Sequence, residues 1–295
     1  MANLKEVRNR ISSVSSTQQI TKAMKMVSAA KLKRATNAIV QLRPYANKMK
    51  EMLVGLLNNL EGSSSPFTED RGASKVLLIV ISSNRGLAGA FNMNVIKATN
   101  SLVTEKYAKQ YQKGNLHLIA IGKKVQEFYE KRKFTVIGNN NELYNELTFE
   151  NVSKIAEQVM QLFVAGEYDR VELVYNQFRN AAVQILTTEL LLPVKHLTEI
   201  SNTSSVKQVD YIFEPSREAI VEQLIPKSIK VQLYKAILDS HASEHGARMT
   251  AMDKATDNAG DLLKTLKLSY NQARQAAITT ELTEIVSGAA ALSGG

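Results

Sequence analysis

The sequence predicts an α/β fold in which the two ends of the chain form a long antiparallel two-helix coiled coil, with a central Rossmann-like α/β domain. Three observations lead to this prediction. Apolar residues recur in three- and four-residue steps at both ends, short apolar runs alternate with helical patterns in the middle, and only 6% of the residues are aromatic. Low aromatic content suits long helical pairs, which need few large rings in their seam.

The first long helix is predicted from residue 3 to about residue 60. Its apolar pattern begins at Leu4, Val7, Ile11 and Val14, and it resumes in a shifted phase at Ile20, Met24 and Val27. From there the expected seam is regular: Leu32, Ala35, Ile39, Leu42, Ala46, Met49, Leu53, Leu56 and Leu60. Pro44 is expected to kink or bend this helix, because proline removes a backbone donor. The Gly-Ser-Pro stretch 61–66 ends it.

The middle of the chain alternates strands and helices. Strands are predicted at these ranges: 75–82, 116–122, 134–137, 170–178 and 183–192. Helices are predicted at 91–111, 123–131 and 149–165. Such alternation is typical of a mostly parallel sheet covered on both faces. Residues 193–210 are polar and predicted as a loop, and 211–214 as a short strand.

The second long helix is predicted from about Pro226 to Ala291, roughly 65 residues and nearly 100 Å at ~1.5 Å per residue. Its steps alternate three and four, the period of a coiled coil. The expected seam is Met249, Met252, Thr256, Ala259, Leu263, Leu266, Tyr270, Ala273, Ala277, Thr280, Glu284, Ser287 and Ala291. Many of these side chains are small, so a partner backbone could approach closely.

These patterns divide the chain into an N-terminal coiled-coil helix at 1–60, an α/β domain at 70–195 and a C-terminal coiled-coil helix at 210–295. A helix this long needs a partner for its apolar seam. If both long helices project from the same side of the α/β domain, they run antiparallel and bury each other's seams, forming one shaft.

The net charge of +9 is concentrated at one end. The first sixty residues carry 11 Lys or Arg and 2 Asp or Glu. An acidic partner is one interpretation, a solvated basic face is another, and a nucleic acid is a third. Nucleic-acid binding lacks support from aromatic stacking residues or a base-reading motif in this helix.

The chain has no cysteine, which excludes disulfides and thiolate metal sites, and it shows no apolar run of membrane-spanning length.

Two motifs suggest chemistry without establishing it. Ser82 to Gly89 follows the first strand and opens a helix, where a nucleotide loop would lie, but it matches neither common phosphate-loop pattern. Its glycines also suit a tight turn. The stretch His241 to His245 matches the inverted zinc-protease pattern His-x-x-Glu-His, yet it lies inside a coiled-coil helix, where a polar seam residue can set register. An α/β enzyme remains an alternative, although no nucleophile–base arrangement is visible.

Both ends of the chain resemble the gamma subunit of rotary, F-type ATP synthases. The likeness rests on residues 20–31 (Ile-Thr-Lys-Ala-Met-Lys-Met-Val-Ser-Ala-Ala-Lys), on residues 248–259 (Arg-Met-x-Ala-Met-x-x-Ala-Thr-Asp-Asn-Ala) and on residues 278–289 (Ile-Thr-x-Glu-x-x-Glu-x-x-x-Gly-Ala). The middle follows the strand–helix order of the family more loosely. It departs from it at Asn84 and Ala88, where relatives usually have Asp and Cys. The resemblance is to the bacterial type, since the chain lacks the cysteine pair of the chloroplast type and a targeting peptide.

The resemblance implies a non-catalytic rotor shaft that turns inside a ring of alpha and beta subunits and couples proton flow to ATP synthesis on the beta subunits. It implies no catalytic residue, cofactor or metal of its own. The implied partners are alpha, beta, epsilon and the membrane ring of c subunits, and the implied location is the cytoplasmic side of the cell (inner) membrane, held peripherally through the complex.

The resemblance also implies subunit-contact residues. These are Lys22, Met24, Lys25, Arg274, Gln275, Glu281, Tyr211 and Phe213. The basic residues of the first helix, with Lys31, Lys33 and Arg34, would face acidic beta-subunit loops, and Arg274 with Gln275 would act as a catch. The small, mostly apolar tip 285–292 would sit in an apolar bearing, and Tyr211 and Phe213 with Tyr45 would lie at the foot, toward epsilon and the membrane ring.

Overall fold

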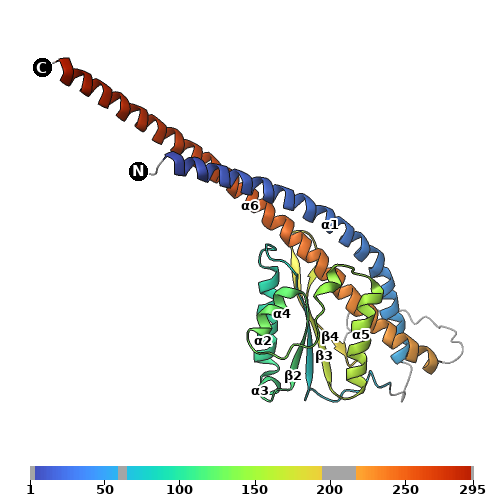
Figure 1. The fold of residues 1–295 in the computed structure, drawn as a ribbon. Helices are drawn as coiled ribbons and strands as arrows, with labels where there is room; N and C mark the ends of the chain where they lie inside the picture. Colours follow the sequence, from blue (N-terminus) through green and yellow to red (C-terminus); the bar gives the residue numbers. More distant parts are fainter. Residues whose placement is uncertain (1–3, 59–64, 195–216, 294–295) are drawn as a thin grey trace. The chain divides into compact units, whose positions relative to one another are not determined.

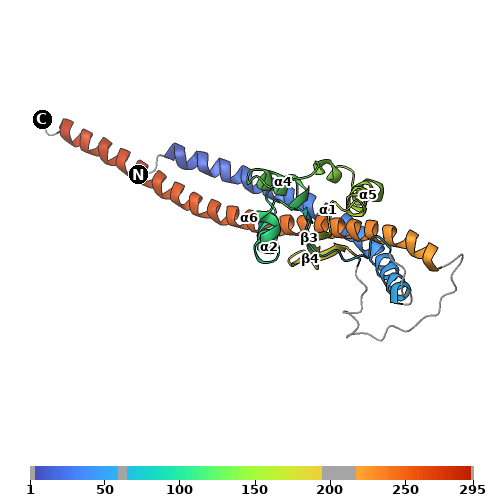
Figure 2. The same ribbon diagram turned by 90° about the horizontal axis from the view of Figure 1, so that it is seen from below.

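The computed structural model describes residues 4–58, 65–194 and 217–293 (Figures 1 and 2). It contains two compact units. The coiled-coil unit comprises residues 1–28 and 249–295, and the α/β unit comprises residues 29–248. Two helices run through both: α1 (Leu4–Asn58) and α6 (Arg217–Ser293), of 55 and 77 residues. The predicted fold class, long terminal helices with a central α/β sheet, is confirmed.

The α/β unit is built on a four-stranded mixed sheet with the strand order β2-β1-β3-β4. Strands β1 (Val76–Ile81), β2 (Leu116–Ile121) and β3 (Arg170–Phe178) are parallel, whereas β4 (Gln184–Leu192) pairs antiparallel with β3. All six residues of β1 are buried. A central strand buried on both faces requires a continuous apolar run, which is what Val-Leu-Leu-Ile-Val-Ile supplies.

Helices cover both faces of this sheet (Figure 1). On one face, α2 (Phe91–Glu105) and α4 (Lys123–Glu130) pack on Leu78, Val80 and Val174. On the other, α5 (Phe149–Val164) and the first part of α6 share a larger apolar core with Ile79, Ile81 and Leu173. The Thr148 side chain caps α5 by accepting from the Asn151 amide at 3.3 Å.

Two middle segments differ from the sequence prediction. The helix expected at 91–111 is divided into α2 and the short α3 (Ala108–Gln112), because the chain turns at Tyr107, which is buried. The strand expected at 134–137 contributes only one isolated bridge, from Val136 to Leu118. A 3₁₀ helix, η1 (Asn141–Tyr144), follows it. The strand expected at 211–214 lies outside the described residues.

The buried face of α1 follows one seven-residue phase from its first turn to Leu53. The side chains on that face are Leu4, Val7, Ile11, Val14, Gln18, Thr21, Lys25, Ser28, Leu32, Ala35, Ile39, Leu42, Ala46, Met49 and Leu53, all buried or half-buried. The shifted phase predicted for Ile20 and Val27 is wrong, since these side chains are 59% and 58% exposed. The apolar residues from Leu4 to Val14 and from Leu32 to Leu53 lie on the same face of the helix. The stretch between them therefore keeps that face covered, although its residues there are polar.

Helix α6 begins at Arg217, nine residues before the predicted start at Pro226. Proline costs the helix one hydrogen bond, but Val221, Ile225 and Ile229 are buried in the core of the α/β unit, and this burial stabilises the earlier turns.

The predicted α6 seam is buried or half-buried from Met249 to Ala277. From Ile278 to Ala290 every side chain is exposed, including the predicted seam residues Thr280, Glu284 and Ser287.

Candidate functional site

The coiled-coil unit is held together by a short set of side-chain contacts between α1 and α6. Thr256 Oγ1 lies 2.8 Å from Thr21 Oγ1, and Gln18 Nε2 donates to the Thr256 carbonyl at 3.5 Å. Lys25 forms an ion pair with Asp253. Apolar contacts supply the rest of the interface, with Val7, Met252, Ala259 and Leu263 buried. The pair is antiparallel: residue numbers fall along one helix as they rise along the other.

The outside of the same unit carries large apolar side chains. On α1 these include Ile20, Met26 and Val27, which are 58–61% exposed. On α6 they include Leu262, Leu268, Ile278, Leu282, Ile285, Val286 and Leu292, of which Leu292 reaches 87%. Scattered exposed apolar residues are ordinary, but this density on the two helices of one unit is typical of a surface that meets other proteins.

The contact residues predicted on α1 lie near one another. Lys22 is exposed, whereas Met24 and Lys25 are half-buried beside α6. The Lys25 ammonium is already paired with Asp253, so it faces α6 as well as solvent. Sequence reasoning missed this pairing. Position 25 belongs to the seven-residue repeat of covered positions on α1. That repeat is the sequence signal that places the Lys25 side chain at the helix–helix interface.

The contact residues predicted on α6 lie farther along the helix. Arg274, Gln275 and Glu281 are all exposed. Arg274 is 18 residues beyond Thr256, about 27 Å along the axis at ~1.5 Å per residue. The structure therefore presents two separate groups of candidate contacts in the coiled-coil unit, one on each helix. Tyr211 and Phe213 lie outside the described residues, and Tyr45 on α1 is 46% exposed.

The loop Ser82–Gly89 in the α/β unit uses its polar groups internally. Asn84 donates to the Asn141 carbonyl at 2.7 Å and accepts from the Lys123 amide at 3.0 Å. Asn92 Oδ1 accepts from the Ser83 amide at 3.0 Å. A Cβ at Gly122 would lie 2.4 Å from the Ser82 carbonyl oxygen, so the glycine is required for steric reasons. This loop is a packed turn between strands and helices rather than a phosphate cradle.

An arginine of α6 anchors that loop. Arg248 is buried and donates to the carbonyl oxygens of Arg85 at 3.2 Å and Gly86 at 3.3 Å. Its other Nη donates to Glu244 at 2.6 Å. Burial raises the pKa of Glu244, and the neighbouring Arg248 guanidinium opposes that rise. The arrangement ties α6 to the carboxyl edge of the sheet.

The two histidines of the His-x-x-Glu-His motif lie side by side, with His245 buried and His241 half-buried. His241 Nε2 and His245 Nε2 lie 3.1 Å apart, and the Tyr144 ring stacks on His241 with centroids 5.7 Å apart. Burial lowers the pKa of His241 to about 4 and that of His245 to about 3, and the charges of Lys31 and Arg248 lower both further. Both imidazoles are therefore neutral at pH 7, with one proton shared between the facing nitrogens.

This pair lacks the ligand set of a zinc site. Across residues 4–58, 65–194 and 217–293, no three His, Cys, Asp or Glu side chains are grouped to hold a metal ion. A catalytic zinc uses three protein ligands, and the nearby Lys31 and Arg248 would repel a cation. The motif is instead a structural element of α6 within the α/β unit.

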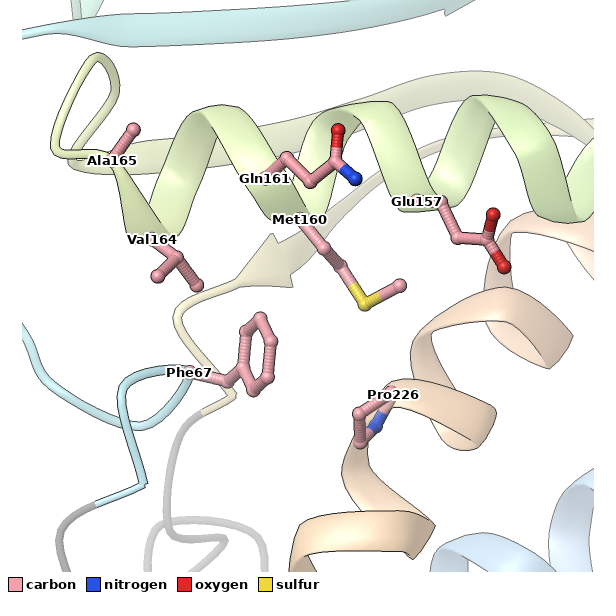
Figure 3. A pocket seen from close by; sticks show the side chains of 7 residues that line it. All are labelled: Phe67, Glu157, Met160, Gln161, Val164, Ala165 and Pro226. Carbon is pink, nitrogen blue, oxygen red and sulfur yellow. The ribbon is translucent and has the colours of Figure 1, made fainter.

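One apolar hollow of about 420 Å³ opens in the α/β unit (Figure 3). It is lined by Phe67, Met160, Val164, Ala165 and Pro226, with Glu157 and Gln161 also contributing. The Glu157 carboxylate accepts from Lys230 at 2.5 Å, so it is already paired. The hollow offers shape and apolar surface but no nucleophile or general base.

No helix in the described part of the chain is both long and apolar enough to cross a membrane.

Fold and surface together define a class of protein: a helical scaffold with a coiled coil bearing exposed apolar side chains, and an α/β unit whose described residues assemble no catalytic constellation. Comparison with known proteins specifies the family. The family model described as ATP synthase matches residues 3–292. The ATP synthase gamma chain of Flavobacterium psychrophilum is 57% identical over 295 residues, covering all of both chains. That of Cytophaga hutchinsonii is 53% identical over 293 residues, covering 99% of each. The chain belongs to the ATP synthase gamma chain family, and these relatives are bacterial.

Solved structures agree with this assignment. A chain from the central stalk and c-ring of the Tetrahymena thermophila mitochondrial ATP synthase is 26% identical with a TM-score of 0.56, covering 80% of this chain and 99% of that one. A chain of the Euglena gracilis mitochondrial ATP synthase has a TM-score of 0.68 at 20% identity, covering 98% and 94%, and supports the fold alone.

Proposed function

We propose that this chain is the central rotor shaft of an ATP synthase. It transmits torque between a proton-driven membrane ring of c subunits and the catalytic beta subunits, and it performs no chemistry itself. Its partners are the alpha and beta subunits of the catalytic ring, epsilon and the c ring. It belongs to a membrane-associated complex, held peripherally on the cytoplasmic side of the cell (inner) membrane.

The observation that carries this proposal is the exposed end of α6. From Ile278 to Ala290 the helix has only exposed side chains, and Ile278, Leu282, Ile285 and Val286 are 47–67% exposed. A single helix of this kind buries almost nothing by itself, and helices gain most of their stability from packing. A bearing formed by surrounding subunits would supply the missing contacts and cover the apolar side chains.

The basic and polar contact residues fit the same role. Lys22, Lys33 and Arg34 on α1 are exposed, so their charges are available to acidic loops of beta subunits. On α6, Arg274 and Gln275 are exposed next to the apolar end and would act as a catch for a beta-subunit loop. Tyr211, Phe213 and Tyr45 are proposed contacts toward epsilon and the c ring.

The test is reconstitution. The purified chain alone should hydrolyse no ATP, whereas its addition to alpha and beta subunits should yield a complex that co-purifies with epsilon. In vesicles containing the membrane sector, that complex should pump protons when given ATP. Turnover by the pure chain, or a complex that forms equally well without it and pumps protons, would rule the proposal out.

A further inference from the structure

The middle of the α1 seam is polar where a coiled coil is normally apolar. Four consecutive seam positions between Val14 and Leu32 hold Gln, Thr, Lys and Ser, and none of their side chains is fully exposed. Thr21 is 8% and Ser28 is 3% exposed. Apolar residues are available in the same stretch but point outward, since Ile20 and Val27 are more than half exposed. The polar side chains therefore define how this part of α1 meets α6.

Three of these positions make matched contacts across the interface. At 2.8 Å, the Thr21 and Thr256 hydroxyl oxygens need a proton between them, so a hydrogen bond joins the helices. Thr21 also lies 3.0 Å from the Gln18 carbonyl, and Thr256 lies 2.7 Å from the Met252 carbonyl. One helical turn away, the Lys25 ammonium is paired with the Asp253 carboxylate.

The third contact depends on a glycine. Gln18 Nε2 donates to the Thr256 carbonyl at 3.5 Å, over the backbone of α6 at Gly260. A Cβ at position 260 would lie 2.9 Å from Gln18 Nε2, so an alanine there would require the flexible end of the Gln18 side chain to move away. Glycine in a helix interior costs roughly 0.5–1 kcal/mol relative to alanine. The space it leaves is occupied by the Gln18 amide.

We propose that these contacts form a register clamp that stops α1 and α6 from sliding along each other under load: Gln18 over Gly260, Thr21 with Thr256, and Lys25 with Asp253. This inference rests on the proposed role of the chain as a shaft. The six residues are positioning residues, since they act on each other and not on any reacting group.

The clamp is needed because the surrounding seam specifies register weakly. Small side chains such as Ala259, Ala273 and Ala277 fit against a facing helix in more than one register. A slip by seven residues keeps the seam phase but brings Thr21 opposite Leu263 and Lys25 opposite Gly260. The Thr21 hydroxyl then loses its partner on α6 and keeps only the Gln18 carbonyl of its own helix, and the ion pair is broken. Single polar seam residues are known to select register in this way.

The experiment measures register and coupling in the same variants. Because the chain has no cysteine, spin labels attach only at introduced sites, and the exposed positions Ser13→Cys and Lys264→Cys report the α1–α6 distance in the full chain. The variants are Thr21→Val with Thr256→Val, and Gly260→Ala. The control is Thr265→Val, an exposed threonine whose hydroxyl bonds only within its own helix.

The control should give one distance, as the parent does. Molecules in the slipped register should give a second distance between the two spin labels. Removing the hydroxyl pair should raise the population of these molecules by roughly fivefold, the factor expected for one net hydrogen bond. In reconstituted vesicles the protons pumped per ATP hydrolysed should fall, while ATP hydrolysis stays near that of the control. Gly260→Ala separates register from stability, because it favours the helix yet displaces Gln18. Its melting temperature should hold or rise while its pumping ratio falls.

Two results would overturn the clamp. One is a single unchanged distance in both variants. The other is a pumping ratio equal to that of Thr265→Val despite a second distance. Failure of the rotor assignment would be seen separately, because the unsubstituted chain would then give no ATP-driven pumping.

Discussion

At the scale of single residues, charge burial explains several features that composition alone does not. Asp239 on α6 is fully buried, although in the sequence it is only an acidic residue that follows the apolar run Ala236-Ile237-Leu238. Arg43 on α1 donates to it at 3.2 Å and to the Phe178 carbonyl at 3.0 Å. Burial raises the pKa of Asp239, and the Arg43 charge opposes that rise. One guanidinium thus joins α1, α6 and the end of β3 within the α/β unit.

Arg43→Met should therefore destabilise the protein by about 2–3 kcal/mol, because it leaves a buried carboxylate without its cation. The measurement is the denaturation midpoint in urea. Lys264→Met is the matched control, since the Lys264–Asp261 pair is highly exposed and should contribute less than about 0.5 kcal/mol. Equal midpoints for the two variants would contradict the buried-pair argument.

The His241–His245 pair predicts an acid-labile α/β unit. Both pKa values are lowered in the folded chain, to about 4 and about 3, whereas unfolded histidine titrates near its ordinary 6.5. Below pH 6.5 the unfolded state therefore binds more protons than the folded state. The stability that the two neutral histidines contribute is fully present above pH 6.5 and is lost as the pH falls toward 4. Each imidazole should contribute up to about 1.4 kcal/mol per pH unit in that window.

Thermal melts at pH 7.5 and pH 5.0 measure this effect. His245→Gln should lose less stability between the two pH values than the unsubstituted chain. The comparison isolates the histidines, because the raised pKa of Glu244 acts in the opposite direction and is present in both proteins. An identical pH dependence in the two proteins would contradict the assignment.

The exposed catch residues belong to the same scale. Arg274→Ala with Gln275→Ala should leave the melting temperature almost unchanged, since both side chains are exposed and surface changes usually stay within about 0.5 kcal/mol. ATP synthesis by the reconstituted complex should fall clearly. Synthesis at the rate of the unsubstituted complex would show that these residues are not a catch.

At the scale of elements, the type of the two long helices was predictable, but the start of α6 and the buried face of α1 were not. The apolar set Ile20, Met24 and Val27 and the polar set Gln18, Thr21, Lys25 and Ser28 have equivalent helical spacing. Hydrophobicity favours the first set, whereas continuity of the seven-residue phase from Val14 to Leu32 favours the second. The structure follows continuity, because a rigid helix cannot rotate its buried face between two fixed segments.

Other differences also come from tertiary packing. The earlier start of α6 depends on a core that no local pattern reveals, and the antiparallel pairing of β4 depends on its neighbour β3. The exposed contact residues Arg274, Gln275 and Glu281 carry no periodic signal, so only the family resemblance could single them out. The Lys25–Asp253 pair joins residues more than two hundred positions apart, which a single sequence cannot show.

The two faces of the paired helices should respond differently to truncation. Met252→Ala removes a buried side chain of α6 and should cost about 2–4 kcal/mol, a lower melting temperature by several degrees. Met26→Ala removes a side chain that is 61% exposed and should leave the melting temperature nearly unchanged while weakening assembly with alpha and beta subunits. Melting curves and co-purification yields measure the two effects. Similar losses of stability in both variants would contradict the assigned burial.

At the scale of the whole molecule, residues 4–58, 65–194 and 217–293 form a scaffold without a catalytic constellation, and the proposed function depends on the subunits that surround it. Its glycine loop and its histidine pair are structural, and many of its exposed apolar side chains, among them Met26, Leu282 and Ile285, lie on the helices that the rotor proposal places inside a ring of subunits. The family assignment rests on similarity over the full chain, including more than half identical residues in two bacterial relatives. The central claim is that this chain turns while the ring around it stays fixed.

Single-molecule rotation tests that claim most directly. The alpha–beta complex is fixed to a surface, and a bead is attached to the chain at Lys109→Cys, an exposed position in a chain with no native cysteine. With ATP the bead should rotate continuously in one direction, and it should stop when ATP is removed. A bead that remains stationary on complexes hydrolysing ATP would contradict the account.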